Sequence, residues 1–168
     1  EESPILEDYI IEIGKKWVSP PYCVDGWRLD VAADLGHSPE YNHHFWKRFR
    51  KAVKEVNPDV MIYAEHYGDA SSWMQGDQWD TVMNYIFYGA IMDLIAHEGI
   101  TVSQFVERIG FTKGNLHTKV YPALFNLIDS HDTPRFLHSA GNSIAKQKLA
   151  AAFQLLSPGM PMIYYGDE

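Results

Sequence analysis

Hydrophobic residues along this chain follow two alternating spacings, one typical of helices and one typical of buried strands. The first two predicted helices each begin with Ser-Pro, a capping hydroxyl followed by proline at the first helical position, and cover residues 3–17 and 38–56. Prolines shortly after each run end these helices. Further apolar segments with helical spacing lie around residues 86–97, 101–109 and 145–156.

Five short apolar runs between these segments predict strands. They lie at residues 25–31, 60–65, 81–85, 124–128 and 160–165. An alternation of strand and helix with doubly buried strands is typical of an α/β fold, in which helices pack over a parallel sheet. No sequence repeat or low-complexity linker interrupts the pattern, so we predict one domain over residues 1–168.

A charged pair ends the first predicted strand. Trp27, Leu29 and Val31 alternate with Arg28 and Asp30, so the arginine and the aspartate are expected on one face. A guanidinium so close to a carboxylate favours the ionised form of Asp30. An ionised, immobile carboxylate at a strand end is what a nucleophile or a cation stabiliser requires. For an isolated Arg-x-Asp pair, however, a structural ion pair is the commoner explanation.

Three acidic residues follow three of the strands, namely Asp30, Glu65 and Asp132. Equivalent ends of parallel strands converge on the carboxyl edge of the sheet, and this is the edge where (β/α)8 barrels have their active sites. Three carboxylates brought together repel one another, so at least one is expected to hold a proton and act as an acid. Glu65 is the best candidate for that acid, because aromatic residues and no cation surround it in sequence. Asp30, beside Arg28, is the best candidate to stay ionised.

An acid and an ionised nucleophile close together are the equipment of a retaining glycosidase, whose two carboxyl groups lie about 5–5.5 Å apart. The loop between the second and third strands carries Tyr67, Trp73 and Trp79, which are candidates to stack on sugar rings. Packing beneath the loop is the more common role for any single one of them.

Four motifs carry a family resemblance. In order, spacing and strand placement they resemble successive regions of glycoside hydrolase family 13, the α-amylase family. The motifs are Gly26-Trp-Arg-Leu-Asp30, Ala64-Glu65, Ser130-His131-Asp132 and the run from Gly159 to Glu168. Residues 73–79 and 82–85 are most similar to the branch of neopullulanase, cyclomaltodextrinase and maltogenic amylase. The resemblance implies a partial TIM (β/α)8 barrel, strands four to eight with their helices, so that residues 1–168 are the C-terminal part of a catalytic barrel domain.

The resemblance also implies a role for each candidate residue. Asp30 would be the nucleophile, Glu65 the general acid/base, and Asp132 the carboxylate that holds substrate hydroxyls and stabilises the transition state. Arg28 would orient Asp30, and His131 would hydrogen-bond the sugar at the cleavage subsite. The implied function is a retaining hydrolase of α-glucans such as maltooligosaccharides, starch, cyclodextrin or pullulan. A transglycosylase or isomerase of the same family, and a non-catalytic relative, remain the alternatives.

Two departures from the family pattern limit what can be carried over. Where many α-amylases have Lys-His after the nucleophile strand, this chain has Ala33-Asp34, so acceptor-side binding and product pattern do not transfer. The chain also begins after the third strand, so we expect a fragment that is inactive alone. The resemblance implies no required cofactor within this segment, and any calcium would belong to the inserted domain that is absent here.

The charge and the cysteine content of the chain restrict the kinds of partner that it can bind and the covalent links that it can form. The formal net charge is −8 and no long basic run occurs, which argues against nucleic acid or an anionic membrane as a partner. The only cysteine, Cys23, excludes an internal disulfide and leaves the compartment open. Oligomeric state is not determined by the sequence.

A metallohydrolase is an alternative function of a different class. Its candidate metal ligands would be Asp30, Asp34, His37, His43 and His44. These histidines lack a second cluster at ligand spacing, so we interpret them as cap and surface residues.

Overall fold

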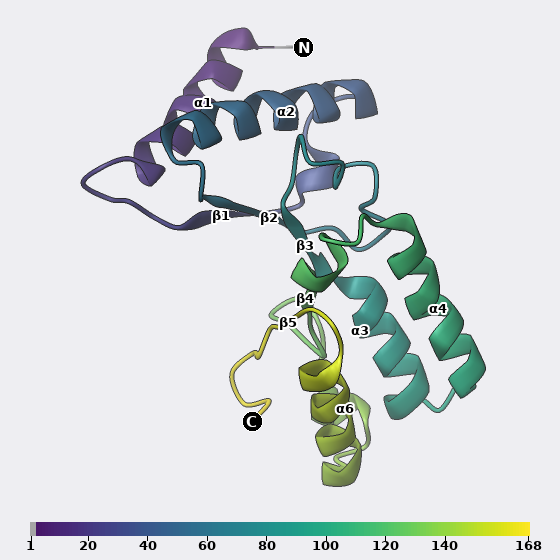
Figure 1. Cartoon of the computed structure of the whole chain (residues 1–168). Coiled ribbons are helices and arrows are strands. Elements are labelled where there is room, and N and C mark those ends of the chain that lie inside the picture. The colour runs from purple at the N-terminus through teal and green to yellow at the C-terminus, as the bar shows by residue number, and fades with distance from the viewer. Residues whose placement is uncertain (1–2) are drawn as a thin grey trace. The chain divides into compact units, whose positions relative to one another are not determined.

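The computed structural model describes residues 3–168 and contains short parallel strands alternating with helices, which confirms the predicted α/β fold class (Figure 1). The strands are β1 Gly26–Leu29, β2 Met61–Ala64, β3 Thr81–Asn84, β4 Phe125–Asn126 and β5 Met160–Pro161. The α-helices are α1 Pro4–Val18, α2 Pro39–Val56, α3 Tyr85–Ile91, α4 Val102–Asn115, α5 Phe136–Ser139 and α6 Ile144–Leu156. Three further turns of 3-10 or π type are η1 Ala32–Asp34, η2 Met92–Ala96 and η3 Tyr121–Ala123.

Both predicted Ser-Pro helix starts are confirmed. The Ser3 hydroxyl accepts a hydrogen bond from the backbone N–H of Leu6, and the Ser38 hydroxyl accepts one from the N–H of Tyr41, at 3.4 and 3.2 Å. Each hydroxyl satisfies one of the N–H groups that a helix leaves without an internal partner. The short helix α5 was not predicted, because four residues are too few to show a helical period.

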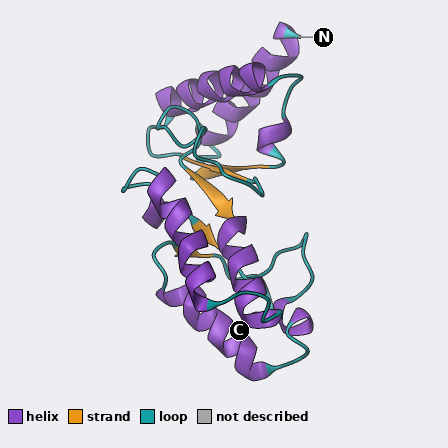
Figure 2. Cartoon of the chain, turned by 90° about the vertical axis from the view of Figure 1, so that its right-hand side faces the viewer, coloured by secondary structure: helices purple, strands orange, loops and turns teal. Residues whose placement is uncertain are grey.

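The last two predicted strands are shorter in the structure than the apolar runs that predicted them. Of the residues in these two runs, only Phe125–Asn126 and Met160–Pro161 pair as strands, as the short orange arrows of Figure 2 illustrate. The side-chain amide of Gln154 donates to the carbonyl groups of Asn126 and Met162, at 3.0 and 2.8 Å. The carbonyl of Asn126 also accepts from the backbone N–H of Met162 at 2.8 Å, so this buried glutamine adds to the strand pairing at the point where the ladder ends.

The described chain divides into two compact units. The first comprises the chain through His66 together with Ala70–Val82, and the second comprises Tyr67–Asp69 and Met83–Glu168. Strand β3 passes from one to the other, and its first half pairs with β2 while its second half pairs with β4. All ladders are parallel and follow the order of the strands in the chain.

In the first unit, α1 and α2 pack against each other beside β1 and β2. The close approach requires a glycine, because a Cβ on Gly14 would lie 2.5 Å from a ring carbon of Phe49. In the second unit, α3 packs against α4 and η2, and α6 packs against η2 and α5. The buried core of that unit includes Ile91, Ile95, Phe105, Phe136 and Ala150. Among the described residues, no helix is long and apolar enough to cross a bilayer.

Candidate active site

Asp30 and Glu65 lie next to each other at the carboxyl edge of β1 and β2. The parallel register pairs Leu29 with Ala64, so each carboxylate comes one residue after the last ladder pair. The chain then turns sharply at Val31, whose φ of 46° lies in the left-handed region that β-branched residues rarely adopt. The backbone N–H of Val31 donates to a carboxylate oxygen of Glu65 at 2.9 Å. This turn thus ties the chain directly after Asp30 to the Glu65 side chain.

Arg28 contacts both carboxylates. Its Nη1 donates to Asp30, and its Nη2 lies 3.2 Å from Glu65 Oε1. No arginine or lysine lies beside Glu65 in sequence, but the parallel pairing of β1 with β2 brings Arg28 across from the neighbouring strand. Partial burial opposes the charge on Arg28, but the hydrogen bond to Asp30 and the charge of Glu65 outweigh it and raise the pKa of the guanidinium.

The two carboxylates differ sharply in exposure. The side chain of Asp30 is 74% exposed, whereas that of Glu65 is 5% exposed. In this chain Asp30 is therefore accessible to solvent, and Glu65 is enclosed. Tyr63 lies opposite Arg28 in the ladder. Burial is the main cause that raises the pKa of its hydroxyl to about 12. The charge of Arg28 lowers this pKa, and the charge of Glu65 raises it. Tyr63 consequently stays protonated near neutral pH.

Asn42 on α2 supports the turn after Asp30, and sequence reasoning did not identify it. It is 1% exposed, and its amide nitrogen contacts the carbonyl oxygens of Ala32, Ala33 and Leu35 at 2.9, 3.0 and 2.9 Å. Its amide oxygen accepts from the indole N–H of Trp73 at 2.8 Å. Nothing local in the sequence indicates this role, because the carbonyl groups belong to a different element.

We expect Asn42→Ala to destabilise the intact protein by about 2–4 kcal/mol, because the part-buried carbonyls of Ala33 and Leu35 and the indole N–H of Trp73 lose the amide of Asn42. The carbonyl of Ala32 keeps a second donor in the indole N–H of Trp46. Chemical unfolding of the substituted and unsubstituted proteins measures the difference. The matched control is His44→Ala, on the same helix but exposed. An equal, small effect for both variants would show that Asn42 does not hold the turn.

His131 and Asp132 lie in the second unit, in the turn that follows β4. The backbone N–H of Asp132 donates to the Ser130 hydroxyl at 3.2 Å, and the N–H of Ser130 donates to the Thr133 hydroxyl at 2.8 Å. His131 Nε2 lies 3.1 Å from an Asp132 carboxylate oxygen. The two side chains are 55% and 41% exposed, so both remain open to solvent on a turn that is hydrogen-bonded from within. The structure thus groups Arg28, Asp30 and Glu65 in one unit, and His131 with Asp132 in the other.

The three loop aromatics have different surroundings. Trp79 is 1% exposed and stacks on Trp73 with ring centroids 4.8 Å apart, so both form part of the packing beneath the loop. Tyr67 is 55% exposed, and one face of its ring stacks on Tyr85 at 3.8 Å in the second unit. Of the three, Tyr67 alone combines an exposed ring with a rigid aromatic support, which suits contact with a flat ligand face.

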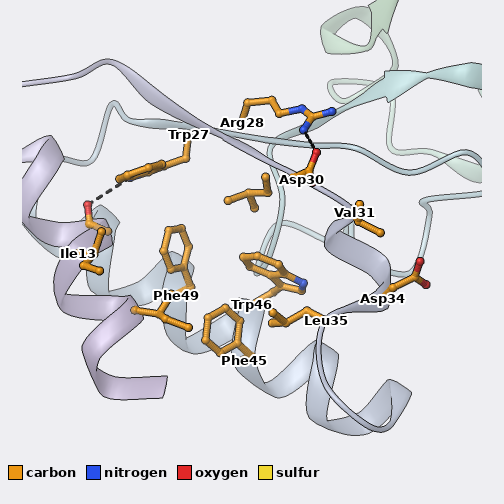
Figure 3. A pocket seen from close by; sticks show the side chains of 13 residues that line it. Ile13, Trp27, Arg28, Asp30, Val31, Asp34, Leu35, Phe45, Trp46 and Phe49 are labelled. Carbon is orange, nitrogen blue, oxygen red and sulfur yellow. Dashed lines mark hydrogen bonds and ion pairs between the residues drawn. The ribbon is translucent and has the colours of Figure 1, made fainter. Parts of the chain in front are cut away.

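A cavity of about 370 Å³ lies in the first unit beside β1. In Figure 3 the Arg28–Asp30 pair lies on one side of it, and the rings of Phe45, Trp46 and Phe49 lie on the other. Apart from the charged pair and Asp34, its lining is apolar. Such a lining suits apolar side chains better than the hydroxyl groups of a sugar.

The histidines proposed as metal ligands have other contacts. His43 Nδ1 lies 2.7 Å from the side-chain oxygen of Gln78, and the His37 ring packs on Tyr41. Within residues 3–168, no three His, Cys, Asp or Glu side chains form a group that could hold a metal ion.

Comparison with known proteins gives consistent relatives. The model of the alpha amylase catalytic domain matches residues 1–168. The chain is 42% identical over 167 residues to a cyclomaltodextrinase of Thermoanaerobacter pseudethanolicus, and 40% identical over 167 residues to neopullulanase 2 of Thermoactinomyces vulgaris. These alignments cover 99% of this chain but 28% and 27% of the two relatives, so the chain spans little more than a quarter of their length.

Superposition on solved structures finds enzymes similar to these relatives. A cyclomaltodextrinase structure superposes with a TM-score of 0.90 at 38% identity, covering 98% of this chain and 27% of the other. The cyclic alpha-maltosyl-(1→6)-maltose hydrolase from Arthrobacter globiformis also reaches 0.90, at 31% identity, with 99% and 36% covered. These matches confirm the predicted fold class, a partial (β/α)8 barrel. With a matching domain model over the whole chain and relatives near 40% identity, this chain belongs to the alpha-amylase catalytic-domain family, and its resemblance to the neopullulanase and cyclomaltodextrinase branch is confirmed.

Proposed function

We propose that residues 1–168 form the C-terminal part of a catalytic (β/α)8 barrel domain, in a protein that hydrolyses α-glucans with retention of configuration. The observation that carries this proposal is the contact of Arg28 with both Asp30 and Glu65 at the ends of adjacent parallel strands. Arg28 thus shows that an exposed carboxylate and a buried one meet at a single place, as the two carboxyl groups of a retaining glycosidase must. The names of two relatives, cyclomaltodextrinase and neopullulanase, support glucan substrates.

The first chemical step forms a covalent intermediate. A carboxylate oxygen of Asp30 attacks the anomeric carbon while Glu65 gives its proton to the glycosidic oxygen, and the bond to the leaving sugar breaks. Arg28 orients Asp30 through its hydrogen bond to the carboxylate. In the second step Glu65 takes a proton from water, the water oxygen attacks the anomeric carbon, and the ester bond to Asp30 breaks. Two inversions at one carbon leave its configuration unchanged.

The remaining candidates contact the sugar. Asp132 accepts hydrogen bonds from hydroxyl groups of the ring at the cleavage site, and its negative charge stabilises the cationic transition state. His131 donates a further hydrogen bond to that ring. Tyr67 offers its exposed face to a neighbouring sugar ring, supported from behind by Tyr85.

Substrates in this proposal are maltooligosaccharides, starch, cyclodextrins or pullulan. Transglycosylation is the second candidate function, because a sugar hydroxyl can replace water in the second step without any other change to the machinery. The departure at Ala33-Asp34 alters the acceptor side of the site relative to many α-amylases and favours neither water nor a sugar as the acceptor.

Product analysis tests the function. The intact protein is incubated with maltotriose, β-cyclodextrin or pullulan, and the configuration of the first product is followed by NMR. We expect cleavage of at least one glucan with the α-anomer appearing first. Products longer than the substrate would instead indicate transfer. A first product with β configuration, or no cleavage of any of the three, would refute the proposal.

A further inference from the structure

The turn that carries His131 and Asp132 is closed at its two ends by a buried carboxylate. Asp129, 1% exposed, accepts a hydrogen bond from the backbone N–H of Phe136 at 2.8 Å and another from Nη1 of Arg135 at 3.1 Å. The chain before His131 and the chain after Asp132 are thus joined through one side chain. Any change in how Asp129 is held moves both ends of the turn.

Arg135 extends this connection to the segment after β5. Its Nη2 lies 3.2 Å from a carboxylate oxygen of Asp167 and donates to the backbone carbonyl of Tyr165. The guanidinium also lies over the rings of Tyr164 and Tyr165, 4.8 and 5.0 Å from their centroids. A planar cation held by two carboxylates and two rings has little freedom to turn.

Asp167 is itself held in place from three sides. Its backbone N–H donates to the carbonyl of Tyr164 at 3.0 Å, and the N–H of Tyr164 donates to its carboxylate at 3.2 Å. The side-chain amide of Gln147, on α6, donates to its carbonyl at 3.1 Å. The carboxyl group is only 4% exposed. Asp167 is therefore a fixed point from which Arg135 can be oriented.

We propose that Asp167 is a positioning residue for Asp132, acting through Arg135 and Asp129. This inference rests on the proposed function, in which Asp132 contacts the substrate. None of the three residues touches the sugar in this proposal. Their part is to hold the turn in one orientation, and an error of about 1 Å in a catalytic group can lower a rate on the order of 100-fold.

The cluster contains two carboxylates and one guanidinium, so its charge state depends on pH. Burial, followed by the charge and hydrogen bond of Asp129, raises the pKa of Asp167 to about 6, against the lowering effect of Arg135. Below that pH a proton on Asp167 bridges to Asp129, and Arg135 loses one of its two anionic partners. We therefore expect the orientation of the turn to weaken as pH falls through about 6. Other titratable or charged groups beside Asp167 or in the cavity it lines are Tyr164, Lys148 and Glu168.

The test compares kcat and KM of the intact protein on maltotriose from about pH 4.5 to about pH 8, a range that spans an ionisation near 6. Asp167→Asn copies the protonated form. We expect kcat near neutral pH to fall about 10-fold or more with KM changed less than about threefold, because the lost contact acts mainly on the transition state. The ionisation near 6 should also disappear from kcat/KM.

Arg135→Lys is the second variant, since it keeps the charge but cannot bond both carboxylates in one plane. A lysine that no longer bonds Asp167 lowers the pKa of Asp167 less, so we expect the acid limb of kcat/KM to move to higher pH. The matched control is Asp93→Asn, which removes another carboxylate paired with an arginine in the same unit, 2.6 Å from Arg108 and away from the turn. The control should leave kcat and the pH profile unchanged.

Each outcome decides the inference. It is overturned if Asp167→Asn keeps kcat within about twofold, or keeps the ionisation near 6 despite the loss of the carboxyl. A lower melting temperature with an unchanged pH profile would show a purely structural role. If Asp167→Asn does not fold, the direction of the shift in Arg135→Lys decides. Asp30→Asn is measured in parallel. If that variant remains active the proposed function fails, whereas normal behaviour of the Asp167 and Arg135 variants alone refutes only the positioning role.

Discussion

Asp30→Asn is expected to lower kcat for maltooligosaccharide hydrolysis by about 10,000-fold or more while leaving the intact protein folded. The carboxamide occupies nearly the same volume as the carboxylate but cannot form the glycosyl ester through which the proposed reaction proceeds. Because the Asp30 side chain is 74% exposed, little packing changes, and Arg28 keeps its second carboxylate partner in Glu65.

The measurement is turnover of maltotriose by the purified variant, with the melting temperature recorded beside it. Asp59→Asn is the matched control, because Asp59 is an exposed aspartate near the amino end of β2, opposite the edge where the candidate site lies. The control should behave like the unsubstituted protein. Turnover close to normal in Asp30→Asn would show that Asp30 is not the nucleophile.

Glu65→Gln is expected to reduce hydrolysis of maltooligosaccharides by about 100- to 10,000-fold, because their leaving groups need a proton. An α-glucosyl fluoride has a leaving group that departs without protonation, so its glycosylation step should change by less than about tenfold. The second step still lacks a base to activate water. We therefore expect the glycosyl ester at Asp30 to accumulate and to be detected as an added mass on the protein.

The contacts of Glu65 mean that Glu65→Gln can also affect stability, so loss of folding has to be separated from loss of acid catalysis. One Glu65 oxygen accepts from the N–H of Val31 and the other lies beside Arg28, so a neutral amide weakens the link between the turn and β2. The melting temperature and the fluoride rate together separate lost folding from lost acid catalysis. An equal loss of the glycosylation step on both substrates would argue against Glu65 as the acid.

Apart from the short helix α5, the local sequence pattern predicted the order of the α-helices and strands and the carboxylates at the strand ends. Ser3 and Ser38 cap helices because a hydroxyl followed by proline acts within one helical turn, which a sequence window contains entirely. Asp30 and Glu65 were expected at one sheet edge because each follows a short apolar strand, and the parallel register of β1 with β2 confirms it. The candidate roles of Asp30 and Glu65 remain predictions that the two substitutions above address, and that of Asp132 remains a prediction as well.

Contacts between distant positions were decided only by the tertiary structure. The sequence shows Arg28 beside Asp30, but the pairing of two strands was needed to bring it to Glu65 as well. The connection from Arg135 to Asp167 likewise exists only because the segment after β5 folds back onto the turn after β4. Side chains that meet across elements have no fixed spacing in sequence, since their distance depends on register, packing and burial. The sequence by itself therefore determined the main helices and strands and the carboxylates at the strand ends, and the tertiary structure decided which charges those carboxylates meet.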